Sequence, residues 1–257
     1  MTESRVETGS EPSTPLALED PAYREAVVDL LGVVAYGEIS AFERLAEDAK
    51  LAPTLEDRVA IATMAAGEFS KVAALHRRLE ALGADPFAAM APFSDAIERF
   101  HEHTAPADWY EGLIKAYVGD GLADDFFREI AAYLDDETRD LVVRTLEDSG
   151  HAAFVVDRVR AGIAADHRLG GRLALWGRRL MGEALIQAQR VAAERDALSA
   201  LLAGGTDRPG LDLAAIGRMF ARAQAVNKLL SPLHDGDQVV CAGDVVSHDS
   251  EIGCAPK

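Results

Sequence analysis

The sequence predicts an all-α protein built as a bundle of long helices. Its composition is 49% hydrophobic but only 6% aromatic, and alanine and leucine, both good helix formers, provide the predicted core. Apolar residues recur every three or four positions over long segments, which is the period of a helix with one buried face. The sequence has no strand–helix alternation, no glycine-rich phosphate loop and no repeat of fixed period. Long helices joined by short loops are typical of a bundle.

The first long helix is predicted to start at Asp20-Pro21, where an acid that can cap the helix precedes a proline at the first helical position. Pro53 is expected to end this segment. Between these two points, an apolar stripe predicts the face that the helix buries; its members are Val27, Leu31, Val34, Phe42 and Leu45.

The second helix is predicted to begin after Thr54, with Asp57 three residues later completing a pattern like a capping box. Gly83 is expected to end it, because glycine readily adopts the left-handed conformation that follows many helices. The inner stripe of this helix is predicted to contain Val59, Ala62, Ala65, Val72, Leu75 and Leu79.

The rest of the chain divides into a connector and four further helices. Residues 85–104 contain two proline breaks and are expected to form a connector with one short helix. Helices are predicted at about 107–134, 137–164, from Gly170-Gly171 to about 203, and at 211–230. We expect a disordered N-terminal segment (1–19), one helical domain (20–230) and a flexible C-terminal tail (231–257).

The charge and the ends of the chain restrict its partners and location. The net charge of −17 makes a nucleic-acid partner unlikely, because binding to phosphate backbones depends on Lys and Arg. No segment resembles a membrane span, and the acidic N-terminus lacks the features of a secretion signal. The two cysteines, Cys241 and Cys254, are too few and too close together for a disulfide framework, so we expect a cytoplasmic protein.

Four predicted helices each place an acid on the face that they should bury. Glu38 lies four residues from both Val34 and Phe42, and Glu68 lies four residues before Val72. An isolated carboxylate on an apolar face is costly to bury unless it is paired or binds a cation. The acids on the third and fourth helices are Asp120, with Asp124 as the alternative, and Asp148, which precedes His151 by three residues.

This pattern predicts a metal site inside the bundle. An acid and a histidine three residues apart can reach one ion from the same face of a helix, and two such pairs with two single acids surround two ions in carboxylate bundles. The predicted ligands are Glu38, Glu68, Asp120, Asp148 and His151. Carboxylate and imidazole ligands with open positions suit iron or manganese.

Lys71 departs from this pattern, because it stands where a histidine should follow Glu68. A protonated lysine cannot bind a metal ion, but its charge could substitute for one. Three alternatives remain open: one ion held by the other ligands, a lysine–carboxylate network with no metal, or a lysine whose pKa is lowered enough to make it a ligand or a base.

The residues also resemble a known family. The stretches DLLGVVAYGEISAFERLAEDAKLAPTLEDRVAIATMAAGEFSKVAALHRRL, LIKAYVGDGLADDFFREIAAYLDDETRDLVVRTLEDSGHAAF and LALWGRRLMGEALIQAQRVAAERDAL look like a ferritin-like family of high-GC bacteria. That family is similar to the tRNA hydroxylase that oxidises the methylthio-isopentenyl side chain of a modified adenosine. The resemblance covers roughly residues 22–230. It implies a ferritin-like four-helix bundle with additional C-terminal helices.

The resemblance implies a non-haem di-iron mono-oxygenase, with the ligands named above and Lys71 in the position of the first histidine. The first functional hypothesis is therefore a metal-dependent oxidoreductase or hydroxylase that uses iron, as a di-iron centre or a single ion, or manganese. Its substrate would be a small or carrier-bound molecule. The alternative is a non-catalytic ferritin-like scaffold that binds a partner and holds no metal. By analogy with other bundles, we expect a homodimer without a membrane partner.

Overall fold

The computed structural model describes residues 16–131, 133–145 and 151–202, and the regular elements in these ranges are all helices. The long helices are α2 (Pro21–Asp48), α3 (Leu55–Ala81), α6 (Trp109–Ala131) and α9 (Arg168–Glu194). The shorter helices are α1 (Leu16–Glu19), α4 (Pro86–Met90), α5 (Ser94–His103), α7 (Asp136–Thr145), α8 (His151–Ala165) and α10 (Asp196–Leu202), with single 3₁₀ turns at Ala49–Leu51 and Ala91–Phe93.

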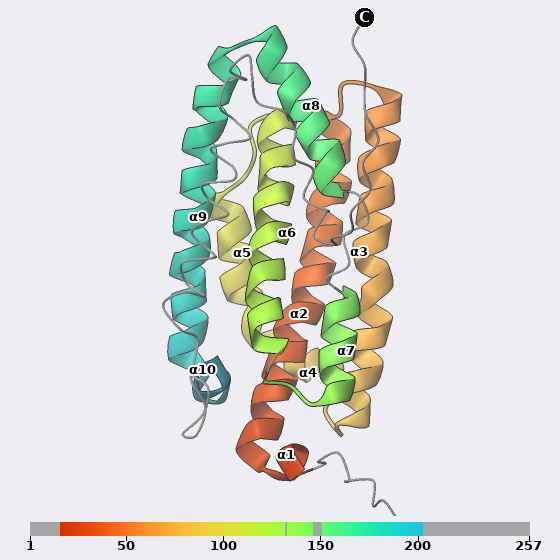
Figure 1. The fold of residues 1–257 in the computed structure, drawn as a ribbon, viewed down its shortest axis with the longest axis vertical. Helices are drawn as coiled ribbons and strands as arrows, with labels where there is room; N and C mark the ends of the chain where they lie inside the picture. Colours follow the sequence, from red (N-terminus) through yellow and green to blue (C-terminus); the bar gives the residue numbers. More distant parts are fainter. Residues whose placement is uncertain (1–15, 132, 146–150, 203–257) are drawn as a thin grey trace, which may run out of the picture.

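The long helices run side by side along the length of the molecule (Figure 1). Helices α2, α3 and α6 form three columns of a bundle, and α7 and α8 lie one beyond the other in the fourth. Helix α9 packs on the outside, against α5, α6 and α8. This arrangement confirms the predicted all-α bundle.

Local capping explains why α2 and α3 begin where the sequence predicts. The carboxylate of Asp20 accepts a hydrogen bond from the backbone N–H of Ala22, and Pro21 occupies the first turn of α2. Thr54 caps α3 by accepting from the N–H of Asp57, and its hydroxyl donates to the Asp57 carboxylate at 2.7 Å. The two side chains thus fix each other, as in a capping box.

The end of α3 also agrees with the prediction. Gly83 has a φ of 76°, in the left-handed region that favours glycine. Its N–H donates to the carbonyl of Glu80, and the N–H of Ala84 donates to that of Leu79. These two bonds satisfy carbonyls that would otherwise lack partners at the end of the helix.

The predicted inner stripe of α3 is wrong at its N-terminal end. Val59 is 57% exposed and Ala62 is also exposed, whereas Ile61 and Met64 are buried. Glu68 lies nine positions after Val59, which corresponds to two and a half helical turns, so the two side chains point in opposite directions. The burial of Glu68 therefore determines that Val59 faces outward.

The later helices differ from the prediction in their ends. The segment predicted as one helix over 137–164 contains α7 and α8, and residues 146–150 between them lie outside the described ranges. Helix α9 starts at Arg168, before the two glycines, and ends at Glu194, and α10 begins two residues later at Asp196. Residues Leu16–Glu19, predicted to be disordered, are helical. The predicted helix at 211–230 and the tail lie outside the described part.

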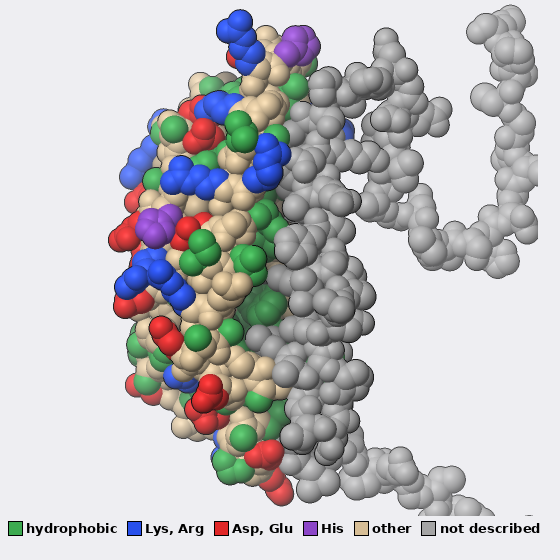
Figure 2. Space-filling view, turned by 90° about the vertical axis from the view of Figure 1, so that its left-hand side faces the viewer, with side chains coloured by type: hydrophobic (Ala, Val, Ile, Leu, Met, Phe, Trp, Pro, Cys, Tyr) green, Lys and Arg blue, Asp and Glu red, His purple; other side chains and the backbone are tan. Residues whose placement is uncertain are grey.

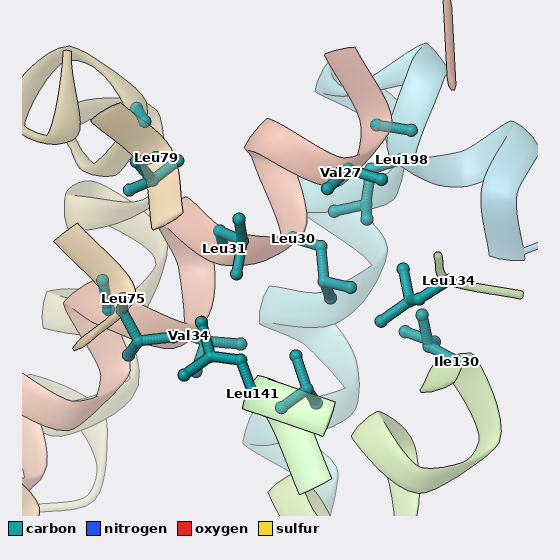
Figure 3. Close-up of a cluster of buried hydrophobic side chains, with 14 of the residues drawn as sticks. Val27, Leu30, Leu31, Val34, Leu75, Leu79, Ile130, Leu134, Leu141 and Leu198 are labelled. Carbon is teal, nitrogen blue, oxygen red and sulfur yellow. The ribbon is translucent and has the colours of Figure 1, made fainter. Parts of the chain in front are cut away.

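Two apolar clusters fill the bundle, one toward each end. One is formed mainly by the second half of α2, the first halves of α3 and α6, and the helices α8 and α9. The other is formed by the first half of α2, the end of α3, the end of α6, and the helices α4, α7 and α10 (Figure 3). Its labelled side chains are Val27, Leu30, Leu31, Val34, Leu75, Leu79, Ile130, Leu134, Leu141 and Leu198.

The negative charge of the chain is not spread evenly over its surface. On the face formed by α9, most Lys and Arg side chains lie in the upper half, whereas acids occur in both halves (Figure 2). Arg172 is paired there with Glu111 at 2.7 Å, and Arg179 donates to the carbonyl of His103. None of the described helices combines the length and the apolar character needed to cross a membrane.

The contact of α2 with α4 leads to a first prediction. A Cβ atom on Gly32 would lie 2.2 Å from the carbonyl oxygen of Ala89, whereas a Cβ on Gly37 would have nothing within 4 Å. Gly32→Ala should therefore force the two helices apart and lower the free energy of unfolding by about 2 kcal/mol. In the matched control, Gly37→Ala should raise it by roughly 0.5 kcal/mol, because alanine favours a helix. Urea unfolding followed by circular dichroism measures both, and equal effects of the two variants would contradict the close packing.

Candidate functional site

Three of the predicted site residues meet between α2 and α3. The Lys71 ammonium nitrogen lies 2.6 Å from Oε2 of Glu68 and 3.4 Å from Oε2 of Glu38. The two carboxyl side chains are only 11% and 8% exposed, and that of Lys71 is 26% exposed. The predicted inward acids on these helices are therefore confirmed as buried, and a cation lies between them.

The sequence places this polar group at the junction of the two apolar clusters. Along α2, Glu38 follows the members of one cluster that end near Ala35 and precedes those of the other that begin near Phe42. Along α3, Glu68 and Lys71 lie between Ala65 of one cluster and Ala74 of the other. The apolar packing on either side excludes water from the carboxyl groups, so their charge has to be compensated locally.

The two acids differ in protonation. Burial raises the pKa of Glu38 to about 9, and its hydrogen bond to Glu68 adds to this effect. Burial would also raise the pKa of Glu68, but the hydrogen bond from Glu38 and the charge of Lys71 lower it below its ordinary value. Burial acts to lower the pKa of Lys71, but Glu38 and Glu68 together raise it. At neutral pH the group therefore holds one carboxylate, one ammonium and one neutral acid, with no net charge.

His151 approaches the same centre from the start of α8. Its Nδ1 lies 3.5 Å from Oε1 of Glu68, and its side chain is 16% exposed. Glu68 thus faces Lys71 with one oxygen and His151 with the other. The prediction that Glu68 and His151 come together from distant parts of the sequence agrees with this geometry.

The structure does not describe the side chains of the remaining predicted ligands. Asp120 and Asp124 lie on α6, but their side chains are outside the described part of the structure, and Asp148 lies outside the described residues. Among the side chains that are described, no three His, Cys, Asp or Glu residues are arranged to hold a metal ion.

The described residues do not fit a dinuclear metal centre. The Lys71 ammonium lies against the oxygens of Glu38 and Glu68 that would have to bind a shared ion. Oε2 of Glu38 is buried and has no hydrogen-bond partner, although the ammonium is 3.4 Å away. An ion here would have to displace the ammonium and take the proton from Glu38, because both metal ligands must be deprotonated.

A second buried polar group lies between α2, α5 and α6, and the sequence did not predict it. Lys115 is 6% exposed, and its burial lowers its pKa to about 8. Burial raises the pKa of nearby Asp48 to about 6 and lowers that of His101 to about 3. The clue for Lys115 was its position directly after the apolar pair Leu113-Ile114, but a single lysine in such a run usually extends to solvent.

The fold and the centre define a ferritin-like bundle in which a lysine occupies the polar interior. Comparison with protein families agrees with this class, since residues 21–205 match the family described as "Ferritin-like domain, actinomycetes". The chain therefore belongs to this ferritin-like family. A search of curated proteins found no match.

The ion pair at the centre leads to a second prediction. Lys71→Met removes the only described ammonium beside Glu68 and leaves a buried carboxylate without its cation. We expect the free energy of unfolding at pH 7 to fall by about 2 kcal/mol, less than for a fully buried pair because Lys71 is partly exposed. The double variant Lys71→Met/Glu68→Gln should recover most of this loss, since it also removes the charge. A loss below about 0.5 kcal/mol for Lys71→Met would show that the side chain lies in solvent.

The protonation of Glu38 leads to a third prediction. Its pKa of about 9 in the folded protein is above the ordinary value of 4.5, so the folded state holds a proton that the unfolded state releases. The resulting stabilisation is complete below pH 4.5 and is lost as the pH rises through 9. The unfolding free energy of the wild type should therefore decrease between pH 6 and 9 by up to about 1 kcal/mol per pH unit relative to Glu38→Gln, which cannot titrate. Parallel pH profiles of the two proteins would contradict the protonated state.

Proposed function

We propose that this protein is a non-catalytic ferritin-like scaffold that acts by binding a partner, with the Lys71 ammonium in the place of a metal ion. The observation that carries this proposal is the position of Nζ, 2.6 Å from Glu68 and 3.4 Å from Glu38. The ammonium supplies the positive charge that buried acids require, without any open coordination position. A fixed and charge-neutral centre preserves the bundle but offers no ion at which oxygen could bind.

Proton counting supports the same proposal. To admit a divalent ion, the centre would have to lose the Lys71 ammonium, which the two acids hold in its charged form, and one proton from Glu38, whose pKa is about 9. Both losses are unfavourable at neutral pH, so they reduce the apparent affinity for a metal. The same centre in an enzyme of this class would have a neutral histidine in place of Lys71, which binds metal without this cost.

A metal-dependent hydroxylase or other oxidoreductase is the second candidate. The observation in its favour is the position of His151, 3.5 Å from the oxygen of Glu68 that does not face Lys71. A single iron or manganese ion held by Glu68, His151 and Glu38 would require Lys71 to move away. A tRNA substrate is the less favoured form of this candidate, because the net charge of −17 repels a phosphate backbone. A small or carrier-bound substrate is compatible with that charge.

Metal content distinguishes the two candidates. The full chain, produced with excess iron and manganese and then desalted at pH 7, should contain far less than one ion per chain by elemental analysis. Its melting temperature should not change with a chelator, because no bound metal stabilises the folded state. Roughly two ions per chain, or one ion whose removal lowers the melting temperature, would refute the scaffold and support the hydroxylase.

The variant Lys71→His provides the matched control for this experiment. It removes the ammonium and supplies the ligand that the pattern of carboxylate bundles places at this position. We expect this variant to bind more metal than the wild type under the same conditions. If both proteins remain free of metal, Lys71 is not what prevents binding, and the proposed substitution of ammonium for metal is wrong.

A further inference from the structure

A pocket of about 220 Å³ opens between α3 and α7, away from the central acids. Four lining residues, Ala74, Arg77, Arg78 and Ala81, follow one stripe of α3, since they are spaced by three and four positions. The others come from one stripe of α7 and are Glu137, Leu141 and Arg144. The two alanines leave the space open, and the long arginine side chains surround it.

One of the three arginines is held firmly in the wall of the pocket. Arg78 is 8% exposed and lies 2.8 Å from Asp135, and it donates to Thr138 at 3.0 Å. It also pairs with Glu137, whose side chain is 76% exposed. These contacts fix the guanidinium of Arg78 between the end of α6 and the start of α7.

The other two arginines have no such partners. Arg77 and Arg144 are exposed, and neither makes an ion pair or a side-chain hydrogen bond within the described part of the chain. The α9 arginine Arg172, by contrast, is paired with both Asp108 and Glu111.

The charge of the pocket is therefore positive on a strongly negative molecule. Three guanidinium groups and one carboxylate, that of Glu137, line the pocket, and the carboxylate of Asp135 also pairs with Arg78, so positive groups still exceed negative ones by one. Guanidinium groups form paired hydrogen bonds with planar or tetrahedral oxyanions, and several of them around one space favour a doubly charged anion. Because the molecule as a whole is strongly negative, a phosphate anion would be drawn to its positive regions, and this pocket is one of them.

We propose that the pocket between α3 and α7 is a binding site for a small anion that carries a phosphate group, held by Arg77, Arg144 and Arg78. The ligand is either free phosphate or the phosphate of a small monoester, since both present the same oxygens. This site goes beyond the proposed scaffold function and does not depend on it. None of its residues touches Glu38, Glu68 or Lys71 through a described hydrogen bond or ion pair.

Calorimetric titration of the full chain tests the site with two ligands, inorganic phosphate and glycerol 3-phosphate, at constant ionic strength. We expect saturable binding at one site per chain. Arg77→Gln and Arg144→Gln should each weaken it at least about fivefold, because each removes a charge-assisted contact. Glu137→Gln should strengthen it, because it removes a carboxylate that lines the pocket. Arg139→Gln, on the same helix but outside the pocket, is the control and should bind as the wild type does.

The pattern of results decides between the outcomes. Tighter binding of the monoester identifies the ligand as an esterified phosphate, whereas tighter binding of inorganic phosphate identifies the free ion. No heat beyond that of an equal addition of chloride would overturn the proposal. So would binding that Arg77→Gln and Arg144→Gln reduce no more than Arg139→Gln does. Circular dichroism of each variant verifies that the helices are intact, so that weaker binding is not a result of unfolding.

Discussion

The central constraint on this molecule is the burial of two carboxyl groups beside one another at the midpoint of a helical bundle. Glu38 and Glu68 come from different helices, and neither can be ionised there without a nearby cation. The protein meets this requirement with the ammonium of Lys71 and with one retained proton on Glu38. The charged group lies between the two apolar clusters along α2 and α3.

The Lys71 ammonium and a metal ion cannot both lie between Glu38 and Glu68. A divalent ion and an ammonium would both occupy the space between the carboxylates, and their positive charges would repel each other. The charge of two metal ions can balance several ionised carboxylates, whereas the charge of one ammonium balances a single carboxylate. Retention of the Glu38 proton follows from this difference, because Glu38, Glu68 and Lys71 would otherwise carry a net negative charge in a dry interior.

The sequence determined much of this structure, where the signals were local. Caps at Asp20 and Thr54 and the glycine at position 83 predicted helix ends because they act within one turn. The inward position of Glu38 and Glu68 followed from the helical period. The error at Val59 arose because two apolar stripes on one helix cannot be told apart without knowing which face packs. The approach of Ala89 to Gly32, the burial of Lys115, and the pocket between α3 and α7 depend on contacts between distant segments. No local pattern in the sequence encodes them.

Other buried ionic contacts would connect the helices of the metal-free scaffold that we propose. A metal ion with ligands from several helices would tie those helices together. Lys71 lies on the same helix as Glu68, so their pair links no helices, and only the longer contact with Glu38 reaches α2. Three arginines provide such links elsewhere. Arg195 pairs with Asp29 of α2, Arg158 of α8 pairs with Asp57 of α3 at 2.6 Å, and Arg78 pairs with Asp135 after α6 at 2.8 Å. The carboxylates of the first two pairs are almost fully buried, and loss of either guanidinium would leave a charge without compensation. The lysine thus supplies a positive charge at the centre, and the arginine pairs around it connect the helices of the bundle.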